Sequence, residues 1–264
     1  MRLVWTSDIH LNHADFKAWD AWAAQIRKSD ADGLIITGDL SEADDVGFQL
    51  RRIAESFPVT IFFVLGNHDF YGASIASTRR NVASLARDVP SLCYLTDVSS
   101  IELMPGLFLV GEDGWGDGAE GDYENSTVRL NDFVAVKDFC RVDPISWPRL
   151  IREQGMESAG RLRSKLETLP DSAREVLVAT HVPPFRESCW YEGKTTDDNW
   201  APFFVCGSVG EVLKQFAMEH PEVKMTVLCG HTHHSGTAEI MPNLVVHTAS
   251  ADYGTPKVER VLEW

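Results

Sequence analysis

Five short groups of residues carry side chains that bind metal ions, and they are spread over most of the chain. Together they supply two aspartates, one asparagine and four histidines, with a further histidine–aspartate pair. This set exceeds what one ion needs and suits two ions that share a carboxylate. Two ions about 3.5–4 Å apart are the usual equipment for hydrolysing a phosphate ester, so the residue types predict a metal-dependent phosphoesterase. The groups are Asp8-Ile9-His10, Gly38-Asp39, Gly66-Asn67-His68-Asp69, Thr180-His181 and Gly230-His231-Thr232-His233.

Most of these groups follow an apolar run that predicts a buried strand. The runs alternate with amphipathic segments, which favours parallel strands joined by helical crossovers. The last three strands of the chain are expected to be antiparallel. The predicted strands are 3–6, 33–37, 59–64, 92–95, 98–103, 107–110, 176–179, 225–228, 238–241, 244–247 and 258–262. The predicted helices are 13–29, 45–56, 74–88, 127–139, 148–169 and 208–219.

The spacing within the groups predicts how their side chains meet. Asp8 and His10 are two residues apart, as are His231 and His233. In extended backbone such residues point to the same side of the strand. Ligands of open α/β sheets gather at the carboxyl ends of the strands, so we expect all five groups to converge on one site. Three glycines are expected to let the backbone bend sharply beside the ligands. They are Gly38, Gly66 and Gly230.

Length and composition favour one α/β domain over residues 1–264. With 264 residues, of which 44% are hydrophobic, the chain can bury a large core. We expect two packed sheets with helices outside. Two segments, 111–147 and 182–206, depart from the regular alternation. Loops as long as 182–206 are uncommon unless they are functional, so both segments are expected to form a cap for the substrate.

The charge and the cysteines bear on partners and location. The net charge is −15, and residues 112–126 carry six acidic residues and no basic one. A basic face is needed to hold a nucleic-acid backbone, so no long nucleic acid is expected. No apolar run long enough for a membrane helix and no signal peptide are recognised, and no Cys-x-x-Cys pair occurs. These features predict a cytoplasmic protein that does not enter a membrane. The sequence carries no signal for an oligomeric state.

The five groups in this order resemble the calcineurin-like metallophosphoesterase superfamily. Its pattern is D-x-H, then G-D, then G-N-H-D/E, then an isolated H, then G-H-x-H. All five motifs occur here between residues 8 and 233. Each motif is weak alone, but five in order are highly specific. The resemblance implies a four-layer αββα sandwich, in which two mixed β-sheets are flanked by helices.

The resemblance also implies a division of the ligands between two metal ions. The mixture of imidazole and carboxylate favours manganese, with iron, zinc, nickel, cobalt and magnesium as alternatives. Asp39 would bridge the two ions. The first ion would be held by Asp8, His10, Asp39 and His233. The second ion would be held by Asp39, Asn67, His181 and His231.

The implied reaction is in-line attack on phosphorus by a hydroxide that bridges the two ions. His68 would donate a proton to the leaving group or hydrogen-bond a phosphate oxygen. Asp69 would orient His68 and stabilise its charge. Arg129, Lys137 and Arg186 are candidate contacts for the phosphate, although surface solvation explains them as well.

Several functions remain open within and beyond this family. A protein serine/threonine phosphatase is disfavoured, because no arginine follows Asp39 closely and the third motif ends in Asp69 rather than glutamate. A nuclease would commonly add a basic surface and a second domain. A non-catalytic metal-binding scaffold would have lost ligands, and none is missing here. A small soluble phosphoester, either a monoester or a diester, fits best. The aromatic residues of the two cap segments could stack on a flat leaving group or merely pack the loops.

Overall fold

Side chains of the N-terminal strands alternate between two hydrophobic cores. Leu3 and Trp5 of β1 (Arg2–Thr6) lie in the core between the two sheets, whereas Val4 lies in the core beneath the helices. Ile35 and Ile36 of β2 (Gly33–Thr37) divide in the same way. This alternation follows from the two-residue period of a strand. The computed structural model describes all residues from 1 to 264.

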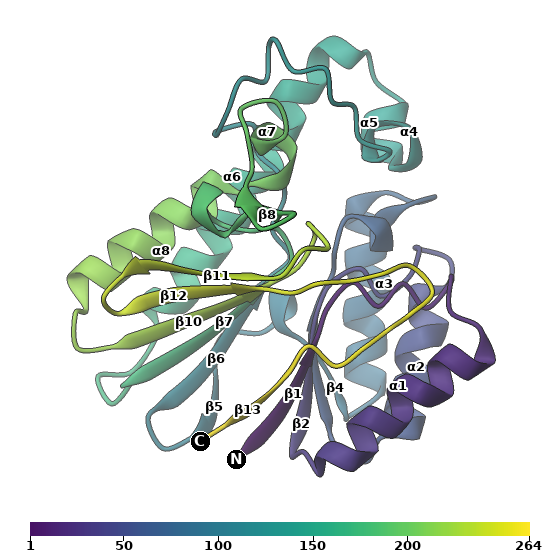
Figure 1. Cartoon of the computed structure of the whole chain (residues 1–264), viewed down its shortest axis with the longest axis vertical. Helices are drawn as coiled ribbons and strands as arrows, with labels where there is room; N and C mark the ends of the chain where they lie inside the picture. Colours follow the sequence, from purple (N-terminus) through teal and green to yellow (C-terminus); the bar gives the residue numbers. More distant parts are fainter.

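The first sheet contains five strands in the order β13-β1-β2-β3-β4. Strands β1 to β4 are parallel, and β13 adds to the edge antiparallel to β1. Three helices, α1, α2 and α3, cover its outer face (Figure 1). The remaining strands are β3 (Thr60–Val64), β4 (Leu92–Tyr94) and β13 (Arg260–Glu263). The helices are α1 (Phe16–Ser29), α2 (Val46–Ser56) and α3 (Ile75–Asp88).

The second sheet contains six strands in the order β11-β12-β10-β7-β6-β5. The four central strands are parallel, and both edge strands are antiparallel to their neighbours. Helices α6 (Trp147–Glu167) and α8 (Gly207–Glu219) cover its outer face (Figure 1). The strands are β5 (Ile101–Met104), β6 (Leu107–Glu112), β7 (Glu175–Thr180), β10 (Lys224–Cys229), β11 (Gly236–Met241) and β12 (Leu244–Thr248).

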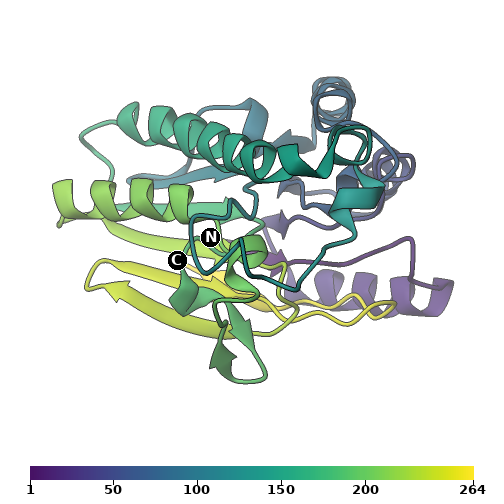
Figure 2. The same ribbon diagram turned by 90° about the horizontal axis from the view of Figure 1, so that it is seen from above.

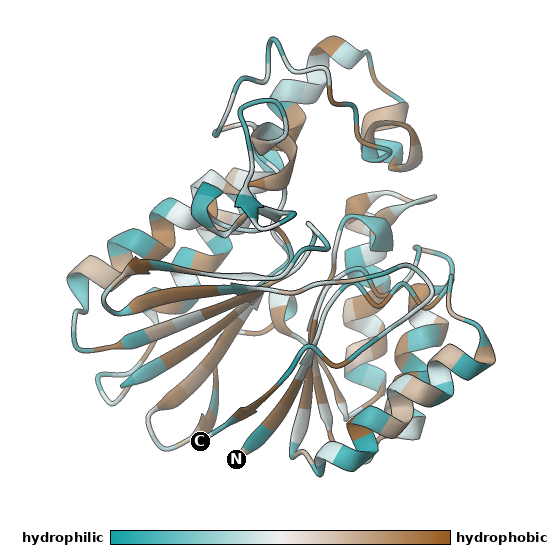
Figure 3. Cartoon of the chain, in the orientation of Figure 1, coloured by the Kyte–Doolittle hydropathy of each residue, from teal (hydrophilic) through white to brown (hydrophobic).

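The two sheets pack face to face, and each carries its helices on the far side (Figure 2). The core between the sheets includes Trp5 and Phe62 from the first sheet and Leu109 and Leu228 from the second. The strands are mostly apolar, while the outer faces of the helices are more hydrophilic (Figure 3). The predicted fold, a four-layer αββα sandwich, is confirmed. None of the helices combines the length and apolar character that crossing a bilayer requires.

The two proposed cap segments lie beyond the carboxyl ends of the central strands (Figure 1). The single helix predicted over 127–139 is wrong, because Val136 is extended and separates two short helices. Segment 182–206 is also more regular than predicted, since it contains a small hairpin and a short helix. These elements are α4 (Asp132–Ala135), α5 (Lys137–Cys140), β8 (Trp190–Tyr191), β9 (Lys194–Thr195) and α7 (Ala201–Phe204). Single 3₁₀ turns occur at His68–Phe70, Leu95–Asp97, Pro144–Ser146 and Arg186–Ser188.

The first helix begins three residues later than its apolar pattern suggests. Asp15 is its N-cap, and the Asp15 carboxylate accepts a hydrogen bond of 2.7 Å from the backbone N–H of Ala18. Such a cap satisfies a backbone donor that has no partner within the helix. The preceding residues, including His13, are therefore free to form the turn that follows the first ligand group.

Candidate metal centre

The five ligand groups lie together at the carboxyl ends of the parallel strands. Asp8 and His10 follow β1, Asp39 follows β2, and Asn67 follows β3 in the first sheet. The remaining groups follow β7 and β10 of the second sheet and supply His181, His231 and His233. The two packed sheets therefore face each other across the site, and each contributes ligands from its own strand ends, as expected from the topology.

The first set of donors is Asp8, His10, Asp39 and His233. One ligand atom from each lies within 4.8 Å of every other. His10 Nε2 and His233 Nε2 are 3.2 Å apart, and His10 Nε2 is 3.7 Å from Asp39 Oδ2. His233 Nε2 is 3.4 Å from Asp8 Oδ1. The second carboxylate oxygen of Asp8 is buried without a hydrogen-bond partner. A buried carboxylate that keeps one oxygen unpaired, while its other oxygen lies beside His233, suits a cation.

The second set of donors centres on His181. Its Nε2 atom lies 3.1 Å from Asn67 Oδ1 and 3.5 Å from Asp39 Oδ1. The rings of His181 and His231 have centroids 5.0 Å apart. Asp39 therefore stands between the two sets, with one carboxylate oxygen toward His10 and the other toward His181. This is the arrangement that a bridging carboxylate requires.

Backbone carbonyls determine which nitrogen of two histidines is free to bind an ion. His181 Nδ1 lies 2.9 Å from the Thr37 carbonyl, and His231 Nε2 lies 3.2 Å from the Phe203 carbonyl. A carbonyl can only accept, so these nitrogens carry the protons. The lone pairs are then on His181 Nε2 and His231 Nδ1. His181 Nε2 consequently faces Asn67 Oδ1, another acceptor, and a cation would satisfy both atoms.

Five of the seven proposed ligands do not lie in extended backbone, so the expectation of same-side i and i+2 side chains is wrong. Asp8 and His10 have φ of 49° and 38°, and Asp39 has φ of 51°. His231 and His233 have φ of 69° and 59°. All five are in the left-handed region, which costs a residue other than glycine on the order of 1–3 kcal/mol. The side chains converge because the chain turns tightly at each strand end, and the fold maintains this strain where the ligands meet.

The glycines beside the ligands have a different role from the one predicted, except at Gly38, where φ is 88°. Gly66 and Gly230 have no left-handed backbone. A Cβ atom on Gly66 would lie 2.2 Å from Asp39 Oδ1, and one on Gly230 would lie 2.0 Å from Asp8 Oδ2. Both positions exclude a side chain because a ligand carboxylate already occupies that space.

The electrostatics of the site reflect two buried carboxylates in close proximity. Burial, and then the charge of Asp8, raise the pKa of Asp39 well above its usual range. Burial also acts to raise the pKa of Asp8, but the hydrogen bond from His233 and the neighbouring imidazoles outweigh it and lower that pKa. Burial lowers the pKa of His10 to about 2, which keeps this imidazole neutral. A divalent ion would bind the lone pair of a neutral imidazole such as that of His10 and would offset the repulsion between the two neighbouring carboxylates.

Asp69 does not contact the imidazole of His68, which differs from the predicted orienting role. The fully buried Asp69 carboxylate accepts hydrogen bonds from the backbone N–H groups of Ser41, at 2.8 Å, and Gly66, at 2.9 Å. These contacts tie the loop after β2 to the loop after β3. Asp69 therefore holds the two segments that carry Asp39 and His68 in register.

His68 is oriented by aromatic rings and by its own backbone. Its ring stacks on Tyr71 with centroids 4.3 Å apart, and its Nε2 atom lies 3.5 Å from the Tyr253 hydroxyl. The backbone N–H of His68 donates to Asp39 Oδ1 at 2.9 Å. Burial, followed by the charge of His181, lowers the pKa of His68 to about 4. The imidazole thus lies beside the donor sets and is neutral at pH 7.

Two residues that the sequence did not single out, Asp132 and Tyr71, orient the amide of Asn67. Asn67 Nδ2 donates to Asp132 Oδ1 at 2.8 Å, and the Tyr71 hydroxyl donates to the same oxygen at 2.7 Å. An amide that donates through Nδ2 must direct Oδ1 the opposite way, here toward His181. Asp132 begins α4 in the first cap segment and is buried. No motif marks it, so only the packing of that segment discloses this role.

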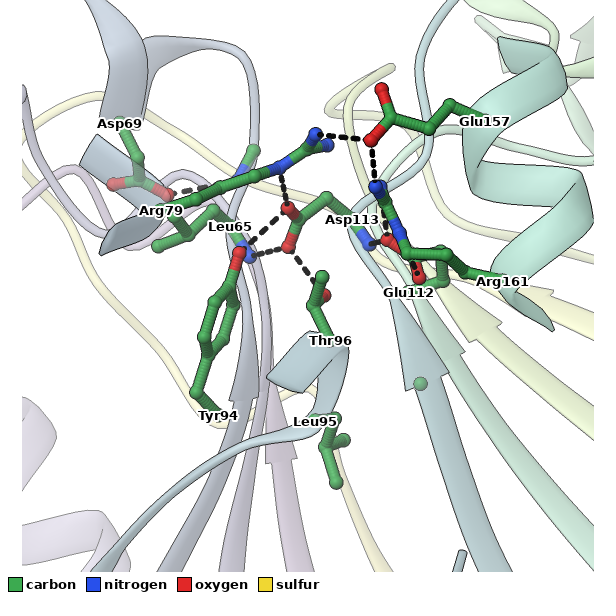
Figure 4. A network of polar contacts seen from close by, with 12 residues as sticks. Leu65, Asp69, Arg79, Tyr94, Leu95, Thr96, Glu112, Asp113, Glu157 and Arg161 are labelled. Carbon is green, nitrogen blue, oxygen red and sulfur yellow. Dashed lines mark hydrogen bonds and ion pairs between the residues drawn. The ribbon is translucent and has the colours of Figure 1, made fainter. Parts of the chain in front are cut away.

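The loop that carries Asn67 and His68 is anchored by a second buried carboxylate, Asp113 (Figure 4). Asp113 Oδ1 accepts from the backbone N–H of Leu65 and from the Thr96 hydroxyl, both at 2.8 Å. Asp113 Oδ2 accepts from Arg79 Nε at 2.9 Å and from the Tyr94 hydroxyl at 2.7 Å. Four donors saturate this carboxylate. Asp113, which follows β6 of the second sheet, therefore fixes the end of β3 in the first sheet, from which the loop with Asn67 and His68 begins.

A cavity of about 860 Å³ opens beside the donor sets. Asp39, Asn67, His68, His231 and His233 line its floor. Both cap segments contribute its walls, through residues such as those of α4, β8 and β9. The three basic residues suggested as phosphate contacts are not among those lining it. They are Arg129, Lys137 and Arg186.

Comparison with known proteins identifies the family. The profile of the Calcineurin-like phosphoesterase family matches residues 1–235. This match covers all five ligand groups and most of the chain. Comparison with curated protein sequences gives no significant match.

Solved structures share the fold at low sequence identity. A phosphopantetheinyl hydrolase from Mycobacterium tuberculosis aligns with a TM-score of 0.69 and 14% identity, covering 96% of this chain and 89% of that one. A dimetal phosphatase from Danio rerio aligns with a TM-score of 0.59 and 14% identity, covering 95% and 87%. GAP50, described as an anchor in the inner membrane complex of Plasmodium, aligns with a TM-score of 0.53 and 12% identity, covering 95% and 71%. These likenesses show the fold alone.

Proposed function

The chain belongs to the calcineurin-like phosphoesterase family, and from that premise we propose that it is a binuclear enzyme that hydrolyses a small soluble phosphoester. The observation that carries the proposal is the pair of donor sets that share Asp39. One set would hold an ion between Asp8, His10, Asp39 and His233. The other would hold an ion between Asp39, Asn67, His181 and His231. Manganese suits this mixture of imidazole, carboxylate and amide ligands.

The donor chemistry supports occupation by cations. Lone pairs face each other at His181 Nε2 and Asn67 Oδ1, and the Asp8 carboxylate, which lies within 4.8 Å of the imidazole ligand atoms of His10 and His233, keeps one buried oxygen without a hydrogen-bond partner. Divalent ions at these positions supply an activated water and stabilise the charge that develops on the phosphoryl oxygens. The protein contributes a prearranged ligand set, because the strained strand-end turns and their supporting hydrogen bonds exist before substrate arrives.

His68 is proposed to hydrogen-bond a phosphate oxygen or to give a proton to the leaving oxygen. Its imidazole borders the cavity, and its stacking on Tyr71 fixes the ring plane. A bound phosphate would favour the protonated form, because an opposite charge nearby raises the pKa of an imidazole. Asp69 is proposed to act indirectly, by holding the loops of Asp39 and His68 together.

The dimensions of the cavity support a small molecule as the substrate. A volume of about 860 Å³ lies within the range of roughly 300–1,000 Å³ that small-ligand pockets occupy. The net charge of −15 disfavours long nucleic acids. The two cap segments, 111–147 and 182–206, are proposed to enclose the part of the substrate that lies beyond the phosphate.

The test is turnover of a phosphomonoester and a phosphodiester, p-nitrophenyl phosphate and bis-p-nitrophenyl phosphate, by metal-free protein and by protein supplied with Mn, Zn, Fe, Ni, Co or Mg. We expect metal-dependent hydrolysis of one or both. Asp39→Asn should abolish it, because both donor sets lose a carboxylate. The matched control is Asp44→Asn, an exposed carboxylate in the same loop that borders neither set. If neither ester is hydrolysed with any of these metals, the proposal that the protein is a phosphoesterase is refuted.

A non-catalytic scaffold is the competing proposal, and the fold likeness to an anchor protein keeps it relevant. The scaffold and the enzyme differ in one measurement. A scaffold would bind metal at both donor sets without hydrolysing either ester, whereas the enzyme would couple metal content to turnover.

A further inference from the structure

Three large aromatic side chains in the cavity remain exposed to solvent. The exposed fractions are 61% for Tyr191, 47% for Trp200 and 52% for Tyr253. All three line the same cavity. Single exposed aromatics are ordinary, but several that share one concave surface mark a place where an apolar ligand packs. Packing of the loops onto the domain, the other explanation of the aromatic residues in the cap segments, accounts for the buried Trp115 and Phe185 but not for the exposed Tyr191 and Trp200.

The aromatic surface begins at the metal ligands themselves. Phe204 packs on the ring of His231 with centroids 4.5 Å apart, and Trp200 lies 5.6 Å from Phe204. Tyr253 packs on the ring of His10 with centroids 4.4 Å apart. A phosphate at the donor sets would thus have aromatic faces directly beside it, on the side of α7 and on the side of Tyr253.

The shape of this surface favours a flat ring over a flexible chain. The apolar lining consists almost wholly of aromatic side chains, and Leu130 is its one aliphatic residue. Aromatic faces are preferred by other planar rings, which they contact in offset or edge-to-face arrangements. An aliphatic chain gains no such geometric advantage from them.

The charge of the cavity excludes further anionic groups from the ligand. Away from the donor sets, Lys194 is the one basic side chain in the lining. Three carboxylates, those of Asp132, Glu192 and Asp197, line the same cavity. A second phosphate or a carboxylate on the substrate would meet more negative than positive charge. The part of the ligand beyond the reacting phosphate is therefore expected to be uncharged.

We propose that the cavity takes a phosphoester whose leaving group is an uncharged alcohol bearing a planar ring, as in a nucleoside monophosphate, with the ring against Trp200 and Tyr191. This inference rests on the proposed function, because it names the substrate class of the same site. Lys194, Thr195 and Asn131 line the cavity with polar groups that can hydrogen-bond the edges of such a ring or its sugar.

The test compares two esters that share a primary alcohol and differ in the ring. Adenosine 5′-monophosphate and ribose 5-phosphate are supplied separately to the manganese-loaded protein, and kcat/KM is measured for each. We expect adenosine monophosphate to be preferred by roughly 10- to 100-fold, as base–aromatic stacking gives. Adenosine diphosphate, which adds an anionic group to the leaving group, should be a poorer substrate than the monophosphate.

Variants assign the preference to the aromatic surface. Trp200→Ala is expected to reduce the ratio of the two kcat/KM values toward one, and Tyr191→Ala supplies the same test should the first variant fold poorly. The control is Phe48→Ala, which removes an exposed aromatic of α2 outside the cavity and should leave the ratio unchanged. An equal loss of the ratio in the control would overturn the assignment.

The outcomes separate this inference from the proposed function. Hydrolysis of both esters with equal kcat/KM would overturn the inference and leave the enzyme intact. Failure to hydrolyse any phosphoester would refute the enzyme. Calorimetry with adenosine then tests ring binding in the cavity without any turnover. Binding that is lost in Trp200→Ala supports the ring site, and absence of binding to the unmodified protein overturns it.

Discussion

Replacement of Asp132 by alanine should selectively weaken the proposed second metal site, which contains Asn67. Asp132 Oδ1 accepts from both Asn67 Nδ2 and the Tyr71 hydroxyl, at 2.8 and 2.7 Å. Without it, the Asn67 amide loses the partner that directs its oxygen toward His181. The amide is then free to rotate, with its nitrogen toward the ion and its oxygen away from it.

The magnitude follows from the two donors that lose Asp132, since Asn67 Nδ2 then keeps only its long contact of 3.4 Å with the Tyr71 hydroxyl. A buried donor left without a partner costs roughly 1–3 kcal/mol. Loss of a group that orients a metal ligand typically lowers metal affinity about 10- to 100-fold. We therefore expect the affinity of the second ion in Asp132→Ala to fall by about that factor. The first set, which contains no residue in contact with Asp132, should keep its affinity.

The affinities are measured by titrating the protein with manganese in a calorimeter. Metal content is measured after dialysis, and folding is measured by thermal denaturation. Asp132→Asn retains an oxygen acceptor at the same position and should recover most of the affinity of the second site. Tyr71→Phe removes the hydroxyl that donates to Asp132 and accepts at 3.4 Å from Asn67 Nδ2, but it leaves the shorter contact between Asn67 and Asp132 in place, so its effect should be smaller. Unchanged affinity for both ions in Asp132→Ala would refute the orienting role. Parallel loss of both ions with unfolding, without recovery by asparagine, would make Asp132 purely structural.

Three further predictions concern single positions. His68→Ala should keep its metal content and lose turnover by roughly 10²- to 10⁴-fold, and loss of metal in that variant would make His68 structural instead. Gly230→Ala should lose metal, because its Cβ would lie 2.0 Å from Asp8 Oδ2. Gly160→Ala in α6 is the contrasting variant, because a Cβ there would have no atom within 4 Å. It should raise the free energy of unfolding, measured in denaturant titrations, by up to about 1 kcal/mol. Burial lowers the pKa of His247 to about 4, below the value of about 6.5 in an unfolded chain. The unfolded state therefore binds the extra proton, and stability is lost as pH falls from about 6.5 to about 4. His247→Gln should flatten this part of the pH–stability profile. An unaltered profile would contradict the lowered pKa of His247.

The fold could be predicted because its signals are local. Apolar runs such as 33–37 and 59–64 mark the buried strands, and their alternation with amphipathic helices favours parallel pairing. The helix predicted over 127–139 failed at Val136, where the chain is extended between two short helices. Such a break depends on contacts with other segments, and one of them is the hydrogen bond from Lys137 N–H to the Ala73 carbonyl.

The support for the site could not be predicted, because its members are distant in sequence and belong to no motif. Asp132 meets Asn67 only after the first cap segment has packed over the strand ends. Asp69 was expected beside the imidazole of His68, its sequence neighbour, yet its carboxylate turns to backbone N–H groups of Ser41 and Gly66. Adjacency along the chain does not establish which groups a buried carboxylate finds within hydrogen-bond reach.

The sequence by itself determined which ligand atoms this protein possesses and in what order they come, since ligand chemistry is a property of residue type. It also placed most of them after strands, because strand periodicity is local. Only the tertiary structure decided how these atoms are presented. It set the left-handed turns at Asp8 and Asp39, the nitrogen that His181 offers, the direction of the Asn67 amide and the aromatic surface beside them. These features depend on contacts and hydrogen bonds between segments that are distant in sequence, and such contacts form only in the packed fold.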